Sequence, residues 1–540
     1  MTADPFGTAD LRSAVLAAWS AHPARFREDA NAEEDHAHGY YRDRVVVELA
    51  QNAADAAARA EQPGRLFLRL RSTPDGGRLL AANTGAPLDA DGVASLASLR
   101  ASAKRDTGVV GRFGVGFAAV RSVADEITVA STTGAVHFSL AATSAELAGA
   151  DPDLACEVER RGGSLPILRL PFPGPGPGGP ALPPDGWDTA VELHLRDAGA
   201  VEQVRAQLTA LGDALLLALP ALAEVEIDVD GEHRSVRAVA SRWVVATRTG
   251  RLDPALLAAR PVEERDRDGW QVTWAVPRVP AQAVAVGTPS PYRSVVHAPT
   301  PTDEPCTVPA LLIATLPLDP SRRHVSPGPL ADTLVEHAGQ VWADLLAACR
   351  DDEGGTARGV RGSAPDPLDL LPEGLPAGAL DAALRAAVVD ATRHVPLFAP
   401  VGGGPALTAS ASVVLEGPVP PAAPAALGPW VPDLVDLSPR HRRLVALLGL
   451  ATAELSDVVD ALPFTEPERH RALYEAFDGA DSRTLEQLAT LPVPLVDGRT
   501  VRGARGLVIA APDVPETLLS ALTTWGLRTV HPQAAHPLLE

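Results

Sequence analysis

Three polar side chains stand at helical spacing in an apolar run, and together they could perform chemistry. Glu48, Asn52 and Asp55 are four and then three residues apart, so a helix over residues 45–60 would place them on one face. The positions between them are mostly Ala, Val and Leu, which a packed helix can bury. Two carboxylates and a carboxamide on an apolar wall are costly unless a ligand or metal satisfies them. A helix with a solvated polar stripe is the structural alternative.

Two glycine-containing segments follow this helix in the sequence, and each could contribute to a ligand site. A predicted hairpin of strands at 65–71 and 78–82 leads into Asn83 and Gly85, where a glycine permits close approach of a flat ligand. Ser102 and Lys104 then precede a glycine-rich run over residues 108–120. The run contains Gly111, Gly114, Val115, Gly116 and Phe117. Backbone N–H groups of such a run can turn toward phosphates, and a following helix adds its positive N-terminus. A flexible loop is the alternative.

The rarity of lysine and asparagine in this chain supports a chemical role for these segments. Arginine has almost replaced lysine, and Lys104 is the only lysine of the chain. Asparagine is also rare, and Asn52 and Asn83 are two of only three. Where a chain avoids a residue type, its few occurrences are expected at positions that need its chemistry.

Together these motifs resemble those of the GHKL ATPase superfamily, which has the Bergerat nucleotide-binding fold. The similarity is closest to the ninety-kilodalton heat-shock chaperones and to the N-terminal repeat of sacsin. Residues 48–56 (ELAQNAADA) resemble the N-box, and residues 111–117 (GRFGVGF) resemble the anchor of the glycine lid. Thr189, which opens a predicted strand, resembles the later threonine motif. The resemblance covers about residues 10–220 and implies an α+β fold, with helices layered on a mixed or antiparallel sheet.

The resemblance also implies roles for single residues. Glu48 would be the general base that polarises the attacking water, and Asn52 would coordinate Mg²⁺ at the phosphates of ATP. Lys104 would add a point charge near the phosphates. Asn83 stands where the chaperones have the aspartate that recognises adenine, and it keeps an acceptor oxygen but not the negative charge. The other expected nucleotide contacts are Asp55, Gly85, Ser102, Gly111, Gly114, Val115, Gly116, Phe117 and Thr189.

A second α+β region is expected over residues 223–352. Its segment 316–323 (LPLDPSRR) resembles a middle-domain segment of the chaperones, which would make Arg322 a catalytic arginine that reaches the terminal phosphate, with Arg323 as a backup. The alternative is a basic loop that pairs with acidic neighbours.

The domain boundaries and the C-terminal region are predicted from weaker sequence signals. The nucleotide domain is expected over residues 1–222, a linker over 353–364, and a mostly helical interaction or scaffold region over 365–540. Within that last region, 397–415 and 495–509 each suggest a strand, a glycine turn and a second strand, a weak internal repeat. Long helices are expected over 10–28 and 201–217. The stretch 31–38 is expected to be an exposed polar connector rather than a metal site.

Bulk composition limits the function classes. The formal charge of −21 and the lack of a basic patch disfavour nucleic-acid binding, including the DNA-linked members of the superfamily. No apolar run reaches the length of a membrane span and no leader is evident, while three distant cysteines favour a reducing compartment, so a cytoplasmic location is expected.

The sequence therefore predicts an Mg²⁺-dependent protein that binds ATP and ADP, a slow ATPase with a chaperone-like conformational cycle that acts on a client protein. The alternative is a nucleotide-binding scaffold without significant turnover. A homodimer is compatible with either function, although no C-terminal dimer domain is recognisable.

Overall fold

The computed structural model describes most of the chain. The described residues are 4–38, 42–98, 116–149, 152–176, 178–258, 260, 265, 268–278, 295–298, 300–319, 323–352, 363–464, 466–510 and 514–540. The chain divides into two compact units. Unit 1 is Met1–Ala338 with two short later segments, and unit 2 is Gly339–Glu353, Ala364–Leu375 and Ala382–Glu540.

Unit 1 is built on an eight-stranded mixed sheet with the order β5-β4-β3-β6-β2-β1-β7-β8. The β1–β7 pair is parallel, and every other pair in this sheet is antiparallel. The sheet continues past residue 222, because β7 begins there and its last strand, β8, ends at Arg237. Its strands are β1 Gly64–Thr73, β2 Gly76–Asn83, β3 Ala124–Ser131, β4 Gly134–Ser139, β5 Phe172–Pro173, β6 Thr189–Leu195, β7 Leu222–Val229 and β8 Glu232–Arg237.

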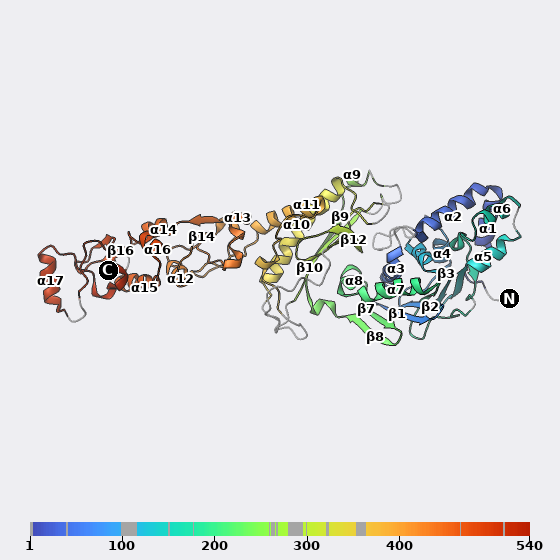
Figure 1. Ribbon diagram of the computed structural model, residues 1–540, viewed down its shortest axis with the longest axis horizontal. Helices are drawn as coiled ribbons and strands as arrows, with labels where there is room; N and C mark the ends of the chain where they lie inside the picture. Colours follow the sequence, from blue (N-terminus) through green and yellow to red (C-terminus); the bar gives the residue numbers. More distant parts are fainter. Residues whose placement is uncertain are drawn as a thin grey trace. The chain divides into compact units, whose positions relative to one another are not determined.

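The two faces of this sheet differ in chemistry. Along β1, Leu66, Leu68 and Leu70 are fully buried, which confirms the predicted alternation. They belong to one apolar core with the helices that cover this face (Figure 1). The opposite face of β1 carries charges, and Arg71 there forms an ion pair with the buried Asp228 of β7. One apolar and one polar face are typical of an antiparallel sheet that is covered on one side.

Two helices precede the sheet where one was expected. α1 is Thr8–Ala21 and α2 is Pro23–His38, so the single helix expected over 10–28 is wrong. The break falls at His22 because the following proline can begin a helix but cannot continue one. The exposed connector expected over 31–38 is also wrong, because these residues form the last turns of α2 and Glu33 among them is buried.

The helix expected over 201–217 is likewise two helices, α7 Ala198–Ala210 and α8 Asp213–Ala218. They are separated by Leu211, which is extended at ψ 129°, and by Gly212. Glycine costs about 1 kcal/mol more than alanine inside a helix, so a break at Gly212 is cheap. α7 packs under β1 and β2 and helps to hold the apolar face of the sheet.

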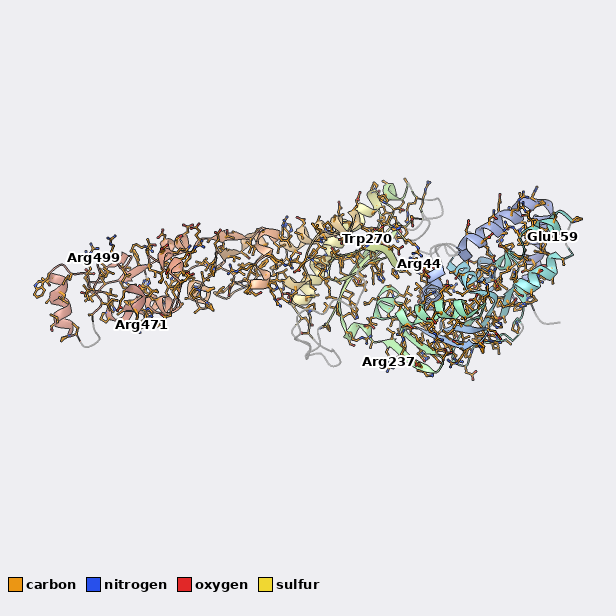
Figure 2. The ribbon with its side chains drawn as sticks, viewed as in Figure 1. Arg44, Glu159, Arg237, Trp270, Arg471 and Arg499 are labelled. Carbon is orange, nitrogen blue, oxygen red and sulfur yellow. The ribbon has the colours of Figure 1, made fainter. Side chains whose placement is uncertain are left out.

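A second sheet completes unit 1, in the order β12-β11-β13-β10-β9. Its residues Ala275, Leu311 and Ile313 share the apolar core of the first sheet. Arg44, just before α3, donates to Thr300 Oγ1 (3.3 Å) and to the carbonyl oxygen of Pro301 (2.7 Å) and so ties the two parts together (Figure 2). The strands are β9 Trp243–Arg251, β10 Gly269–Pro277, β11 Val295–His297, β12 Pro301–Pro305 and β13 Leu311–Ala314.

Unit 1 contains further helices, and apart from α3 they are short. They are α3 Val45–Arg59, α4 Ala90–Leu96, α5 Leu140–Leu147, α6 Pro152–Arg160 and α9 Pro254–Leu257. The boundary between the units falls within α10 Pro329–Arg350 and α11 Ala379–Arg393.

Unit 2 consists of short helices and strands around its own core. The helices are α12 Ala423–Leu427, α13 Leu444–Leu448, α14 Leu455–Ala461, α15 Pro467–Glu475, α16 Ser482–Gln487 and α17 Glu516–Thr524. β14 Val413–Leu415 pairs with β15 Ala451–Ala453 in parallel, and β16 Pro492–Pro494 pairs with β17 Thr500–Arg502 in antiparallel. Short helices and short strands both occur in the described part of this region, but it is not mostly helical, as was expected.

The α+β class is confirmed, with a large mixed sheet and packed helices. Within the described part of the chain, every helix is too short or too polar to cross a bilayer. The three cysteines are free thiols, and burial raises the pKa of Cys306 to about 12, so this thiol stays protonated and unreactive at neutral pH.

A buried network of charges joins four segments of unit 1. Glu33 of α2 accepts from Arg121 Nε (2.7 Å) and from the backbone N–H groups of Ile167 and Leu168 (3.0 Å each). Arg121 also donates to Asp125 at the start of β3. Burial raises the pKa of Glu33, and Arg121 opposes that effect.

The pKa of Asp125 in this network is lowered. Its burial alone would raise its pKa, but hydrogen bonds from Arg196 and Arg121 outweigh that effect and hold the pKa at about 2, below the ordinary value of 3.8. A carboxyl group whose pKa is lower in the folded than in the unfolded protein stabilises the folded state at pH values above its unfolded pKa. This stabilisation is lost as the pH falls toward the pKa of the folded state.

We therefore expect Asp125→Asn to reduce the free energy of unfolding at pH 6 by about 1–2 kcal/mol, a range that allows for solvent screening of this partly exposed group. The difference from the parent should shrink between pH 4 and pH 2. Urea unfolding of both proteins at pH 6, 4.5 and 3 measures it. Asp75→Asn, in the exposed β1–β2 turn, is the matched control and should leave unfolding unchanged. A constant difference across this range would contradict the ionic origin.

Candidate functional site

α3 carries the three polar residues that the sequence singled out. Its Ala-rich face packs on β1 and β2, so the helix forms as predicted over Val45–Arg59. Glu48 is 5% exposed and Asp55 is 1% exposed, while Asn52 between them is half-buried. The polar stripe is therefore not solvated along its length, which contradicts the structural alternative.

Glu48 meets the glycine-rich motif, although 68 positions separate it from Gly116. A Cβ atom added to Gly116 would lie 2.1 Å from Glu48 Oε2 and 3.1 Å from Glu48 Cδ. Glycine at this position therefore leaves room for the Glu48 carboxylate beside η2 (Gly116–Ser122), and a larger residue would require the flexible end of the Glu48 side chain to move. Phe117, next to it, is buried against Phe138, so its side chain belongs to the core and only its backbone faces the motif.

A second cluster of polar side chains lies at the ends of the neighbouring strands β2, β6 and β3. Asn83 on β2 is paired with Thr189 on β6, and Thr189 is paired with Ser131 on β3. Directly opposed residues on antiparallel strands point to the same face. Ser131 Oγ lies 3.1 Å from Thr189 Oγ1. Asn83 is buried on the face that also holds Leu66, its partner on β1, so this polar row extends the apolar face that α3 covers.

Gly85 fixes α3 against this row of strand ends. A Cβ atom added to Gly85 would lie 2.6 Å from the backbone carbon and oxygen of Ala56, and the N–H of Ala86 donates to Ala56 O (2.9 Å). The Gly85 N–H donates to Asp188 Oδ2 (2.9 Å), and the Asp188 N–H donates back to Asn83 O (3.0 Å). The loop after β2 is thus held by reciprocal hydrogen bonds.

Of the predicted site residues, the structure brings Glu48 against Gly116, Asn83 opposite Thr189, and Gly85 against α3, the helix that also carries Asn52 and Asp55; Phe117 follows Gly116 but its side chain lies in the core. Ser102, Lys104, Gly111, Gly114, Val115 and Arg322 lie outside the described residues. Arg323 lies within them, donates to Asp303 (3.0 Å) and lies 3.6 Å from Asp43, just before α3. These ion pairs support the structural alternative for this residue.

Three contributors were missed from the sequence. Asp188 directly precedes the predicted threonine motif, and this adjacency was the available signal. Ser131 ends a predicted strand, which is a weak signal. Glu33 stood in a dense acidic stretch and gave no signal, because its burial depends on Arg121, which lies 88 positions away.

The arrangement has two chemically different ends. Glu48 and Gly116 form one end, and Asn83 with Asp55 and Thr189 forms the other. Glu48 and Asp55 are seven residues apart, which is about 10 Å along a helix. The Asn83 amide donates Nδ2–H to Thr84 O (3.2 Å), which leaves its Oδ1 as the acceptor side. Asn52 lies between the two ends, and its amide oxygen is a hard ligand of the kind that Mg²⁺ prefers.

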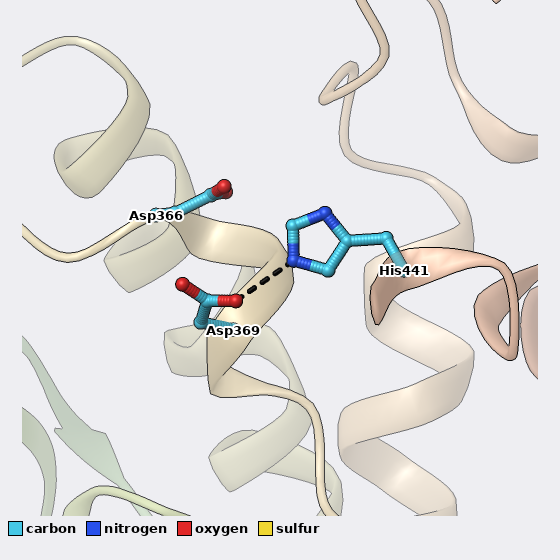
Figure 3. A group of neighbouring side chains, drawn as sticks. All are labelled: Asp366, Asp369 and His441. Carbon is cyan, nitrogen blue, oxygen red and sulfur yellow. Dashed lines mark hydrogen bonds and ion pairs between the residues drawn. The ribbon is translucent and has the colours of Figure 1, made fainter. Parts of the chain in front are cut away.

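A separate group of possible metal ligands occurs in unit 2, where Asp366, Asp369 and His441 gather (Figure 3). His441 Nε2 lies 2.7 Å from Asp369 Oδ1. Arg440 Nη2 lies 3.4 Å from Asp366 and 3.3 Å from Asp369. The two carboxylates already have a cation between them, so this group is an ion-pair network that joins two short 3₁₀ turns.

A scan of the sequence against models of known protein families gives no match, and a search of curated proteins finds no significant match either.

The close contacts at Gly85 give a direct test of this geometry. We expect Gly85→Ala to destabilise unit 1 by about 3 kcal/mol or more, because the methyl group would meet the rigid backbone of α3 at Ala56 and the φ of +133° strains an L-residue. Thermal unfolding followed by circular dichroism measures the loss.

The matched control is Gly186→Ala. Gly186 also has a positive φ (+83°), but a Cβ atom there meets nothing within 4 Å. It should cost about 1 kcal/mol, from backbone strain alone. Equal losses in the two variants would show that α3 does not lie against Gly85.

Proposed function

We propose that the first sheet and its helices form a Bergerat-type nucleotide-binding domain, and that the chain is an Mg²⁺-dependent ATPase with a chaperone-like conformational cycle. The contact between Glu48 and Gly116 is the single observation that carries the proposal. The motifs that resemble the N-box and the lid anchor are distant in sequence, and chance similarity would not require them to meet.

The two ends of the site fit the two ends of a nucleotide. The amide of Asn83 offers an acceptor for an exocyclic amino group, and the polar row of Thr189 and Ser131 lies beside it. At the other end, Gly116 has no side chain of its own, and its backbone N–H would be the contact for phosphate oxygens. ATP is therefore proposed as the ligand.

Asn52 and Glu48 would have different roles in ATP hydrolysis. Asn52 would hold Mg²⁺, and the ion would neutralise charge that develops on the terminal phosphate. Glu48 is held near the site by the helix and by its contact with Gly116. Its carboxylate would orient a water molecule and accept the proton as that water attacks the terminal phosphorus. Its position on a packed helix fixes that geometry more firmly than a loop would.

A nucleotide-binding scaffold without turnover remains the second candidate. It needs the same base and phosphate contacts, but it gives no role to a buried carboxylate at the phosphate end. The two candidates therefore differ at Glu48 and agree at Asn52.

We expect Asn52→Ala to abolish binding of Mg²⁺-ATP, because it removes the only metal ligand expected on α3. Calorimetric titration with ATP, with and without Mg²⁺, separates the metal's share of the affinity from the rest. Arg59→Ala, on the exposed side of the same helix, is the matched control and should bind as the parent does. Unchanged Mg²⁺ dependence in a folded Asn52→Ala protein would remove the metal role.

We expect Glu48→Ala to bind ATP with near-parent affinity and to lose about 100- to 10,000-fold in turnover, which is the usual size of general-base catalysis. Phosphate release under Mg²⁺ saturation measures turnover, and the titration above measures binding. Arg59→Ala again serves as the control.

Three outcomes separate the candidates. Loss of turnover with retained binding supports the general base. Parent-like turnover in Glu48→Ala refutes that role. ATP binding without turnover in the parent itself, with or without added proteins, would favour the scaffold.

A further inference from the structure

The helix that carries Glu48 begins without a side-chain cap. α3 starts at Val45, so Glu48 lies in its first turn. The first N–H groups of a helix have no partner within it, and helix ends tend to fray. Arg44 at the N-cap position makes no side-chain cap hydrogen bond, and its positive charge stands at the unfavourable end of the helix dipole. The position of Glu48 therefore depends on contacts that reach this end of α3 from other elements.

One of these contacts comes from the helices that cover the first sheet. The Val46 N–H donates to Oε1 of Gln207 on α7 (3.0 Å). This bond satisfies one N–H group of the first turn. It does not hold the turn that precedes the helix, η1 (Arg42–Arg44), and the contacts of that turn come from the second sheet.

The second sheet contacts two neighbouring polar residues of η1. Arg44 donates to Thr300 Oγ1 (3.3 Å) and to Pro301 O (2.7 Å), where β11 turns into β12 (Figure 2). Arg323 Nη2 lies 3.6 Å from Asp43 Oδ2. Two separate segments of the second sheet thus hold a single turn. We name these two contacts, at Arg44 and at Asp43, the η1 clamp.

The side of the clamp that belongs to the second sheet is itself well held. Thr302 Oγ1 donates to Val296 O (2.7 Å), which ties β12 to β11. The Asp303 N–H donates to Arg323 O (2.8 Å), and Arg323 Nη1 donates to Asp303 Oδ2 (3.0 Å). The second sheet also shares the apolar core of the first. The clamp therefore joins η1 to a packed part of unit 1.

Arg323 faces carboxylates with both ends of its guanidinium. One Nη group donates to Asp303, and the other lies against Asp43. This pairing with acidic neighbours matches the structural alternative for the residue and not a contact with a phosphate. Its effect is nevertheless directed at the site, because Asp43 precedes Glu48 by only five positions.

We propose that the η1 clamp positions Glu48 for hydrolysis, so that the second sheet is part of the catalytic unit. Asp43, Arg44 and Arg323 are positioning residues in this proposal, since they act through the first turn of α3. A displacement of about 1 Å can cost about 100-fold in rate, so loss of the clamp should affect turnover more than binding. The inference rests on the proposed ATPase function.

The first test removes the stronger contact of the clamp in the full chain. Arg44→Met keeps the aliphatic stem and removes the donors, and it should lower kcat about 10-fold while KM for Mg²⁺-ATP stays within about 2-fold of the parent. Arg44→Lys keeps one donor and should recover part of the loss. Arg251→Met is the matched control, because it breaks an ion pair of the second sheet with Asp268 (3.1 Å) and should keep the parent kcat.

The second test asks whether Asp43 acts through Arg323. Asp43→Asn and Arg323→Gln should each lower kcat by about 2- to 3-fold, since ion pairs with exposed partners contribute little. The double variant should lose no more than Arg323→Gln alone, because the two changes remove one interaction. Fully additive losses would overturn the Asp43 contact of the clamp.

A third measurement needs no turnover. In the nucleotide-free protein, hydrogen exchange of peptides that cover residues 45–52 should be faster in Arg44→Met than in the parent and unchanged in Arg251→Met. Circular dichroism should show both variants folded. Parent-like exchange and kcat in Arg44→Met would overturn the proposal, and so would a rise in KM as large as the fall in kcat.

The same data separate this proposal from the proposed function. A parent that hydrolyses ATP through Glu48, together with an unaffected Arg44→Met variant, would refute the clamp alone. A parent without turnover would refute the proposed function and, with it, the catalytic role of the clamp.

Discussion

The buried ion pair between Glu33 and Arg121 positions the rest of the candidate site. Removing one partner of such a pair leaves an uncompensated buried charge, which typically costs about 3–5 kcal/mol, so the two side chains must be buried together. Arg121 belongs to η2, whose first residue is Gly116. The pair therefore ties η2, whose first residue lies against Glu48, to α2.

The close approach of neighbouring strand ends explains why α3 is rich in alanine. Gly64 and Gly85 both press against this helix, where added Cβ atoms would lie 2.5 Å from Ala57 Cβ and 2.6 Å from Ala56 O. Alanines on the buried side let two strand ends reach the helix backbone. A helix held this tightly cannot shift along the sheet, so Glu48 and Asp55 keep fixed positions relative to Asn83. Rigid placement of acidic groups is what a catalytic site needs and what a merely solvated stripe does not.

Sequence periodicity predicted the elements, and the motifs predicted which of them meet. α3, β1 and β6 follow from alternation and helical spacing, and Gly116 was expected near Glu48 only through the family resemblance. Glu33 could not be predicted, because one buried acid among several exposed ones has no local signature and its partner is 88 positions away. The ends of α1 and α7 were misplaced because a proline or glycine inside an apolar run was given too little weight.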